Sequence, residues 1–225
     1  MSAIPDGAEP ALEQLLRLLE DPRAPIAHST VPHAREVHLA DSLSGLELEP
    51  VRSAARIADL GTGAGLPGLP LAVALPNAHV DLIESSERKC AFLTEAIARL
   101  GVDNAEVICE RSEDWAEREG REAYDAITAR AVGSLPTLAE LASPLLRDGG
   151  VLVAWKGANT ADEEAAAGRA ADRTAMEPLE IRTVQPYPSS RDRHIHLLRK
   201  NGPTPNGLPR RPGMAAKRPF GSERN

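Results

Sequence analysis

Apolar side chains recur along the first fifty residues at the spacing of helices. Four leucines three or four residues apart predict an amphipathic helix over residues 10–20: Leu12, Leu15, Leu16 and Leu19. The same spacing predicts a second helix over residues 33–45, with a buried side formed by Val37, Leu39, Ala40 and Leu43. Prolines between the two runs indicate an irregular connection at Pro22, Pro25 and Pro32. We therefore expect a helical N-terminal extension over residues 1–50, frayed over its first ten residues.

From Arg56 onward, short apolar runs alternate with helical patterns. The runs predict strands at Arg56–Leu60, Val80–Glu84, Ala105–Arg111, Tyr124–Arg130 and Val151–Trp155. The patterns between and after them predict helices at Leu66–Leu75, Glu87–Leu100, Glu113–Glu119, Leu135–Leu146 and 160–173, with an Asp148-Gly149-Gly150 turn before the fifth strand. Two last strands, 179–186 and 193–199, can pair as a hairpin. This alternation indicates an α/β fold, a mostly parallel seven-stranded sheet with helices on both faces.

Composition changes this picture little. The 225 residues suit one domain over residues 51–200 with extensions, and with only 3% aromatic residues its core must be built from Leu, Val, Ala and Ile. No apolar stretch approaches the roughly 20 residues of a membrane span, and Met1–Pro10 lacks the features of a secretory signal. A disulfide framework or a metal site would need more and closer ligands than Cys90 and Cys109. We expect a cytoplasmic protein without a metal.

Charge is distributed unevenly along the chain. The net charge of −7 argues against a nucleic-acid partner, but residues 188–225 contain nine Lys or Arg and two acidic residues. The remainder contains 17 basic and 31 acidic residues. Because residues 202–225 are also rich in Pro, Gly and Arg, we expect a flexible basic tail over residues 201–225 beside an acidic body. A solvated terminus without a partner is the simpler interpretation.

Candidate chemistry begins in the loop after the first predicted strand. Ligands of such sheets bind beyond the carboxyl ends of the strands, where Gly61, Gly63 and Gly65 follow Asp59. Glycines let a ligand approach bare backbone. The dinucleotide fingerprint needs a further glycine where this chain has Leu66, and no Lys-Ser/Thr pair follows to form a P-loop. The loop therefore fits NAD poorly and excludes a P-loop.

Two carboxylates narrow the choice of ligand. Asp59 ends the first strand, where it can receive the ammonium of an amino-acid ligand, and Glu84 ends the second, where an acid accepts ribose hydroxyls. S-adenosylmethionine carries both groups and is the predicted cofactor. Ser112 and Glu113 are placed to reach its adenine, although Ser112 as a helix N-cap is nearly as good an interpretation. For the two carboxylates, the simpler interpretations are a turn cap at Asp59 and a solvated strand end at Glu84.

The end of the fourth strand limits the acceptor. Methylation of pyrimidine carbon-5 needs a cysteine there, and an exocyclic amine is usually gripped by an Asn/Asp-Pro-Pro-aromatic turn. This chain has Ala129-Arg130-Ala131 instead. A ring nitrogen such as guanine N7 has an exposed lone pair and no proton to remove. The segment thus fits methylation of such a nitrogen by positioning without a catalytic base, or a small-molecule acceptor equally well.

Several stretches of the chain stand out together: His38–Leu43, the loop extension Leu66-Pro67-Gly68-Leu69-Pro70, Thr128–Ala131, Trp155–Gly157, and Pro209–Gly213 with Lys217 and Pro219. In this order they resemble the glucose-inhibited division protein B family, the bacterial 16S ribosomal RNA guanine-N7 methyltransferases. The Leu-Pro-Gly-Leu-Pro extension is far more specific than the glycines alone. The likeness spans roughly residues 33–220, while the proline-rich segment before His38 departs from the family.

The resemblance implies a class I, Rossmann-like methyltransferase that methylates N7 of a guanine in the decoding-region loop of 16S ribosomal RNA. Carried over, the family's cofactor contacts fall on Gly61, Leu66, Ser112, Glu113 and Arg130, beside Asp59, Gly63, Gly65 and Glu84. Candidates for positioning the substrate are Arg130, Lys156, His38 and Asp41. The residues expected to contact RNA phosphates are Lys156, Arg191, Arg193, Arg199, Lys200, Arg210, Arg211, Lys217 and Arg218.

The expected partner is small-subunit ribosomal RNA or the 30S particle, bound by a monomer. His38 and Asp41 lie three residues apart on one predicted helix face, so they can act together near the cofactor loop; a surface or core pair is the simpler interpretation. Two further functions stay open at this point. One is a small-molecule or protein methyltransferase on the same fold, and the second is a non-catalytic RNA-binding assembly factor.

Overall fold

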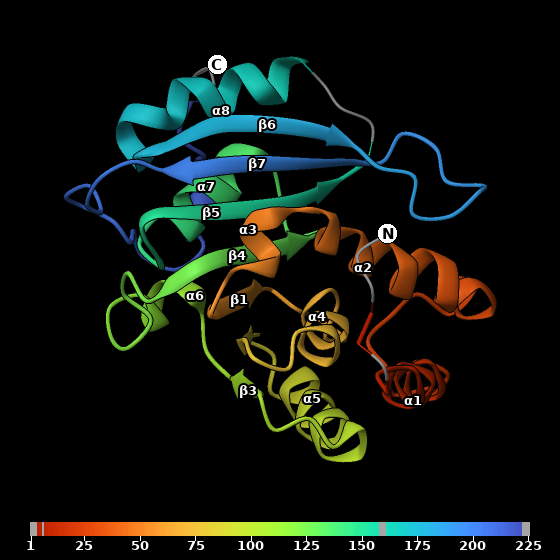
Figure 1. Ribbon diagram of the computed structural model, residues 1–225. Helices are drawn as coiled ribbons and strands as arrows, with labels where there is room; N and C mark the ends of the chain where they lie inside the picture. Colours follow the sequence, from red (N-terminus) through yellow and green to blue (C-terminus); the bar gives the residue numbers. More distant parts are fainter. Residues whose placement is uncertain (1–3, 6, 158–160, 222–225) are drawn as a thin grey trace.

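The computed structural model describes residues 4–5, 7–157 and 161–221, and its centre is a seven-stranded sheet (Figure 1). The strands are β1 Arg56–Leu60, β2 His79–Ile83, β3 Ala105–Ile108, β4 Tyr124–Arg130, β5 Leu146–Lys156, β6 Met176–Thr183 and β7 His194–Lys200. Their order is β3-β2-β1-β4-β5-β7-β6. Strands β1 to β5 are parallel, and β7 runs antiparallel to both β5 and β6. The predicted α/β sheet and its closing hairpin are confirmed.

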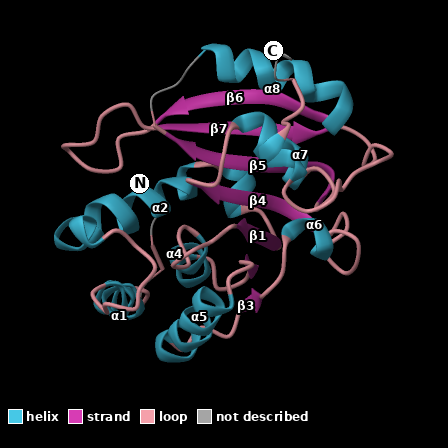
Figure 2. Ribbon diagram, turned by 180° about the vertical axis from the view of Figure 1, so that it is seen from behind, coloured by secondary structure: helices cyan, strands magenta, loops and turns pink. Residues whose placement is uncertain are grey.

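Helices cover both faces of the sheet, as Figures 1 and 2 show from opposite sides. On one face lie α3 Glu49–Arg52, α4 Gly68–Ala74 and α5 Glu87–Leu100, with α1 Glu9–Leu19 packed outside α5. On the other face lie α6 Ser112–Trp115, α7 Leu135–Ala142 and α8 Ala161–Thr174. Leu, Val, Ala and Ile dominate both core layers, as expected from the shortage of aromatic residues. No helix among the described residues has the length and apolar character needed to cross a bilayer.

The predicted boundaries hold best where an apolar run has clear limits. Strands Arg56–Leu60 and Tyr124–Arg130 and helix Glu87–Leu100 have the predicted bounds, and Gly101 closes that helix with a left-handed φ of 64°. The expected turn at Asp148-Gly149-Gly150 is wrong. These residues lie within β5, where the register against β4 shifts between Tyr124 and Ala126, so they form an irregularity inside the strand.

The predicted helix over residues 33–45 is part of an irregular helical stretch over residues 28–47. Its hydrogen bonding changes from a 3₁₀ helix, His28–His33, to a π-helix, Arg35–Ala40, then to α2, Asp41–Leu43, and a 3₁₀ turn, Ser44–Glu47. Segments of π-helix are rare and frequently occur at functional sites. Here the π-helix leads directly into Asp41, which faces the end of β4.

Three expectations about the chain's ends and cysteines are wrong. Residues 202–221 are packed rather than extended, because Leu208 and Phe220 are buried against α8. The tail's average composition concealed these two apolar anchors. Cys90 and Cys109 form a disulfide with a Cα–Cα distance of 5.8 Å, because β3 ends beside the start of α5. The frayed lead expected over residues 1–10 is wrong at its end, because Ala8 is buried and α1 begins at Glu9. Residues 1–3 and 6 of this lead, residues 222–225 of the expected flexible tail and position 160 of a predicted helix lie outside the described residues.

Lys200 is buried at the edge of the sheet opposite the glycine loop, so the expectation that it contacts RNA is wrong. Its ammonium donates hydrogen bonds to Glu122 Oε1 (2.9 Å), the carbonyl oxygen of Leu146 (2.6 Å) and Thr204 Oγ1 (2.8 Å). The side chain is fully buried, and it ties β7 to the start of β5. The neighbouring Arg199 is exposed on the same edge.

Lys200→Ala is expected to lower the free energy of unfolding by about 2 kcal/mol, because it leaves the buried Leu146 carbonyl without its donor. Urea denaturation monitored by circular dichroism measures this change. Arg199→Ala, the matched exposed position, is expected to stay within about 0.5 kcal/mol of the wild type. Equal stabilities of the two variants would contradict the structural role of Lys200.

Candidate active site

The loop after β1 is organised by the buried carboxylate of Asp59. Its Oδ2 accepts hydrogen bonds from Thr62 Oγ1 (2.5 Å) and the backbone N–H of Gly68 (2.8 Å), and its Oδ1 accepts one from Thr128 Oγ1 (2.8 Å). Burial raises the pKa of Asp59 to about 6, against the opposing effect of these hydrogen bonds. Because Asp59 is 0% exposed, the expectation that it receives the ammonium of a ligand is wrong. It holds the loop in shape instead.

The loop's backbone requires its glycines. Gly61, Gly63 and Gly65 have φ values of 63°, 61° and 85°, in the left-handed region that favours glycine. Gly68 is needed for a different reason, because a Cβ at this position would lie 2.8 Å from Asp59 Oδ2. The side chain of Leu66 is buried in the core, so it supports the loop from behind.

A cavity opens beside this loop at the carboxyl ends of β1, β2 and β3. Glu84 lies on its wall and is largely buried. Its Oε1 accepts the backbone N–H groups of Ser85 and Ser86, and its Oε2 lies 3.2 Å from the Gly63 nitrogen and 3.3 Å from Lys89 Nζ. We call this space the cofactor cavity; its lining also includes Leu60, Gly61, Ile83, Val132, Thr137 and Leu141.

Ser112 and Glu113 follow β3 and line the same cavity. Ser112 Oγ donates to Glu113 Oε2 (3.1 Å), and the backbone N–H of Gly213 donates to Glu113 Oε1 (2.8 Å). Helix α6 has Arg111 at its N-cap and no side-chain cap, so the interpretation of Ser112 as an N-cap is wrong. The structure therefore brings Gly61, Glu84, Ser112 and Glu113 to one cavity. Sequence reasoning missed the contribution of Gly213.

A second cavity, the acceptor cavity, lies at the ends of β4 and β5. Arg130 is central to it: Nη1 donates to Asp41 Oδ2 (3.1 Å) and to the Val37 carbonyl (3.2 Å), and Nη2 lies 3.4 Å from His38 Nδ1. Burial and then the nearby guanidinium lower the pKa of His38 to about 4, so its ring is neutral at pH 7. His38 and Asp41 thus meet at the end of β4, as a pair around Arg130.

The far wall of the acceptor cavity comes from β5 and β7. Trp155 donates its Nε1–H to the Asp41 carbonyl (2.9 Å) and also lies 3.1 Å from Ser44 Oγ, which fixes the N-terminal helical stretch on the sheet. Lys156 lines the cavity but pairs with Glu163 (2.6 Å), so its charge is already compensated. Arg193 lies on the same wall. The sequence analysis named Trp155 only within a family stretch and gave it no role, because its partner Asp41 lies 114 residues away. It did not name Glu163, which lies on a helix of surface-like composition.

A three-residue turn after β4 separates the two cavities. Ala131 and Gly133 line the acceptor cavity, whereas Val132 lines the cofactor cavity. Ala131 has a φ of 58°, a left-handed conformation that costs a residue with a Cβ of order 1 kcal/mol or more. Such strain persists where the surrounding structure fixes the backbone. In this conformation, successive residues of one turn line two neighbouring cavities.

The residues expected to contact RNA fall into separate groups. Arg191 and Arg193 lie just before β7, at the edge that carries both cavities, and Arg211, Lys217 and Arg218 are exposed on the C-terminal segment. Arg199 is exposed at the opposite edge, so the structure does not bring it together with the others. Arg210 is engaged with the buried Glu140 through two hydrogen bonds of 2.5 Å, so its guanidinium already has a partner within the fold.

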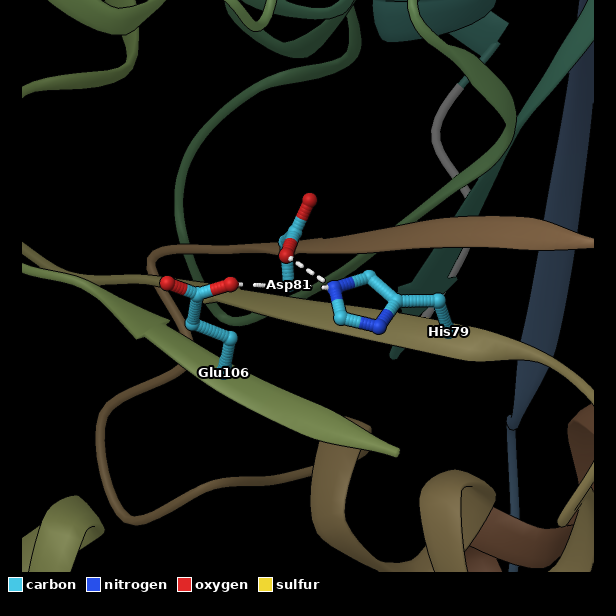
Figure 3. A group of neighbouring side chains, drawn as sticks. All are labelled: His79, Asp81 and Glu106. Atoms are coloured by element: carbon cyan, nitrogen blue, oxygen red, sulfur yellow. Dashed lines mark hydrogen bonds and ion pairs between the residues drawn. The ribbon is translucent and has the colours of Figure 1, made fainter. Parts of the chain in front are cut away.

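One group of described side chains could share a metal ion, away from both cavities. Figure 3 shows His79 and Asp81 on β2 and Glu106 on β3 pointing toward one another. Asp81 is already engaged: Oδ1 lies 2.9 Å from His79 Nε2, and Oδ2 accepts from Arg56 (2.9 Å) and the Tyr124 hydroxyl (2.7 Å). This network is centred on the buried Asp81 and Tyr124 and links β1, β2 and β4, so we assign it a structural role.

Solved structures with the same fold include several methyltransferases. An S-adenosylmethionine-dependent O-methyltransferase of Thermotoga maritima aligns with a TM-score of 0.58 and 15% identity, covering 85% of this chain and 72% of that one. Fibrillarin of Aeropyrum pernix, in complex with natively bound S-adenosylmethionine, aligns with a TM-score of 0.51 and 20% identity over 71% of this chain and 72% of that one. These likenesses show the class I methyltransferase fold.

Sequence relatives are much closer. The ribosomal RNA small subunit methyltransferase G of Pelotomaculum thermopropionicum is 42% identical over 186 residues, 81% of this chain and 77% of the relative. The protein of the same name from Rubrobacter xylanophilus is 44% identical over 188 residues, 81% and 72% of the two chains. Residues 12–195 match the family described as rRNA small subunit methyltransferase G. This chain is therefore a member of the rRNA small subunit methyltransferase G family.

Proposed function

We propose that this protein transfers the methyl group of S-adenosylmethionine to N7 of a guanine in the decoding-region loop of 16S ribosomal RNA. The observation that carries the proposal is the pair of cavities on the two sides of the turn after β4. The cofactor cavity offers glycine backbone and Glu84, and the acceptor cavity offers Arg130, Asp41 and Trp155 without a cysteine among its lining residues. Family membership supports a ribosomal RNA substrate.

Within the cofactor cavity, we assign different residues to the ribose, the adenine and the methionine part of S-adenosylmethionine. Glu84 suits the ribose hydroxyls, because its carboxylate is an acceptor at the end of β2. Ser112 and Glu113 suit the adenine, and the glycine loop suits the methionine part. The methyl group would then face the turn after β4.

The reaction needs positioning more than proton transfer. The bond from N7 to the methyl carbon forms as the bond from that carbon to the sulfonium breaks, and S-adenosylhomocysteine leaves. No proton is removed, because guanine N7 carries none. We assign Asp41 and Arg130 the task of holding the guanine in line with the methyl group, since they share the acceptor cavity and fix one another.

The ribosomal RNA is held by arginines and lysines around the two cavities: Arg191, Arg193, Arg211, Lys217 and Arg218. A base presented in an unstacked conformation would enter the acceptor cavity. We propose that the protein acts as a monomer on small-subunit RNA or on the 30S particle, in the cytoplasm. A small-molecule acceptor would not account for the gathering of these cations around the two cavities.

The direct test is methyl transfer to small-subunit RNA in vitro. Purified protein, S-adenosylmethionine and either naked 16S RNA or 30S particles from cells that lack the gene are expected to yield N7-methylguanosine at a decoding-region position. Nuclease digestion with mass spectrometry identifies the base and its position. Failure to form N7-methylguanosine on both substrates would overturn the proposal.

Glu84→Gln is expected to raise the Kd for S-adenosylmethionine about tenfold, a loss of about 1.4 kcal/mol, because an amide cannot accept both ribose hydroxyls. Its loss of stability is expected to be smaller than that of Asp59→Asn, because the amide oxygen can still accept from Ser85 and Ser86 while the partly exposed ion pair with Lys89 is lost. Asp59→Asn is expected to weaken binding and also to lower the free energy of unfolding by about 2 kcal/mol, because an amide cannot accept all three buried hydrogen bonds. Calorimetric titration and thermal melts separate the two. Unchanged affinity in Glu84→Gln would remove the ribose assignment.

Asp41→Asn is expected to lower kcat/KM for ribosomal RNA on the order of 100-fold while the Kd for the cofactor stays unchanged, because the partner that aligns Arg130 loses its charge. Single-turnover methylation with radiolabelled cofactor measures the first value, and calorimetry measures the second. An equal loss in both would show that Asp41 supports the fold rather than the acceptor.

Arg211→Ala is expected to weaken RNA binding and to reduce the slope of log K against log salt by about 1, because one phosphate contact is lost. Filter binding over a series of salt concentrations gives the slope. Arg199→Ala, on the opposite edge, serves as the matched control and should leave the slope unchanged. A wild-type slope in Arg211→Ala would exclude a phosphate contact at this residue.

A further inference from the structure

The C-terminal segment, residues 201–221, runs from the edge of the sheet opposite the cavities, past the cofactor cavity, to helix α8. It begins at the edge opposite the cavities, where the backbone N–H of Gly202 donates to Asp148 and that of Thr204 donates to Glu122. It ends beside α8, where Arg169 donates to the Gly221 carbonyl. Between these points, α9 Met214–Lys217 packs against α7 at the edge of the cofactor cavity.

Two anchors fix the segment on either side of α9. Before α9, Arg210 forms a two-point pair with Glu140, which is only 2% exposed. After α9, the Phe220 ring lies between the guanidinium groups of Arg173 and Arg210, at 3.8 Å and 4.0 Å from the ring centroid. Phe220 also packs against Leu208. Residues 213–216 are therefore held in place from both ends.

The held residues form part of the wall of the cofactor cavity. Gly213, Ala215 and Ala216 line it, opposite the end of β3. Two contacts set their position: the Gly213 N–H donates to Glu113 Oε1 (2.8 Å), and Thr137 Oγ1 donates to the Ala215 carbonyl (3.2 Å). Gly213 has a φ of 80°, which a glycine adopts without strain.

From these contacts we propose that the C-terminal segment is part of the cofactor site, with residues 213–216 covering the nucleoside half of S-adenosylmethionine. The inference rests on the proposed function, which places the ribose at Glu84 and the adenine at Ser112 and Glu113. Glycine and alanine side chains leave room on this wall for a flat base. The segment thus serves cofactor binding directly, in addition to presenting Arg211 and Lys217 to RNA.

Ala216 provides the sharpest test, because it is exposed to solvent yet lines the cavity. Ala216→Leu adds bulk on the cavity side without disturbing a packed contact of the fold. It is expected to raise the Kd for S-adenosylmethionine about tenfold or more, as overpacking of a filled site does, with an unchanged melting temperature. Asn206→Leu adds the same apolar side chain at an exposed position of the segment away from the cavity, and wild-type affinity is expected.

Calorimetry on the full chain without RNA gives these dissociation constants, and S-adenosylhomocysteine serves as a second probe. Wild-type affinity in Ala216→Leu, with weakened binding in Glu84→Gln, would overturn the inference and leave the proposed function standing. Absence of cofactor binding in the wild-type chain would overturn the proposed function itself. A chain that ends after Gly202, checked for folding by circular dichroism, is expected to bind the cofactor more weakly than Ala216→Leu. Wild-type affinity of that shortened chain would likewise overturn the inference.

Discussion

The binding edge of this sheet depends on a single buried carboxylate. Asp59 ends β1 and gathers three donors, from Thr62, Gly68 and Thr128, so that the glycine loop, the start of α4 and the middle of β4 are held around one point. A carboxylate in a dry interior is stable only when its oxygens are satisfied in this way. The left-handed glycines then let the loop close without a Cβ in the way. The cofactor cavity is the space that this arrangement leaves open.

The acceptor cavity depends on a different kind of constraint. A β-sheet edge alone offers few side chains, and here the N-terminal helical stretch supplies the missing wall. Trp155 on β5 donates a hydrogen bond to the backbone of Asp41, and Arg130 on β4 donates one to its side chain. Two strands therefore hold this residue of the N-terminal helical stretch in place. The irregular π-helical geometry before Asp41 orients this residue toward them.

Much of this architecture was predictable because the apolar runs have distinct lengths and clear limits. The strands at Arg56 and Tyr124 matched residue for residue, and Glu84, Ser112 and Glu113 reached one cavity because parallel strands end at the same edge. Apart from the turn at Asp148-Gly149-Gly150 and the N-cap at Ser112, the errors concern partners distant in sequence. In the sequence, Lys200 looks like a free cation, but the pairing of β7 with β5 buries it beside Glu122. Arg210 looks available for a phosphate, but it forms an ion pair with Glu140 on α7. Local pattern could not reveal that Asp59 faces inward or that Cys90 meets Cys109.

The two cavities share a turn but no lining residue. Substitutions in the N-terminal stretch and at the ends of β5 and β7 can therefore change the lining of the acceptor cavity without altering a residue that lines the cofactor cavity. Under the proposed function, the methyl donor and the acceptor are thus held by separate parts of the chain. The three-residue turn after β4 is the exception, since a shift of its backbone moves a wall of both cavities at once and so couples the two sites.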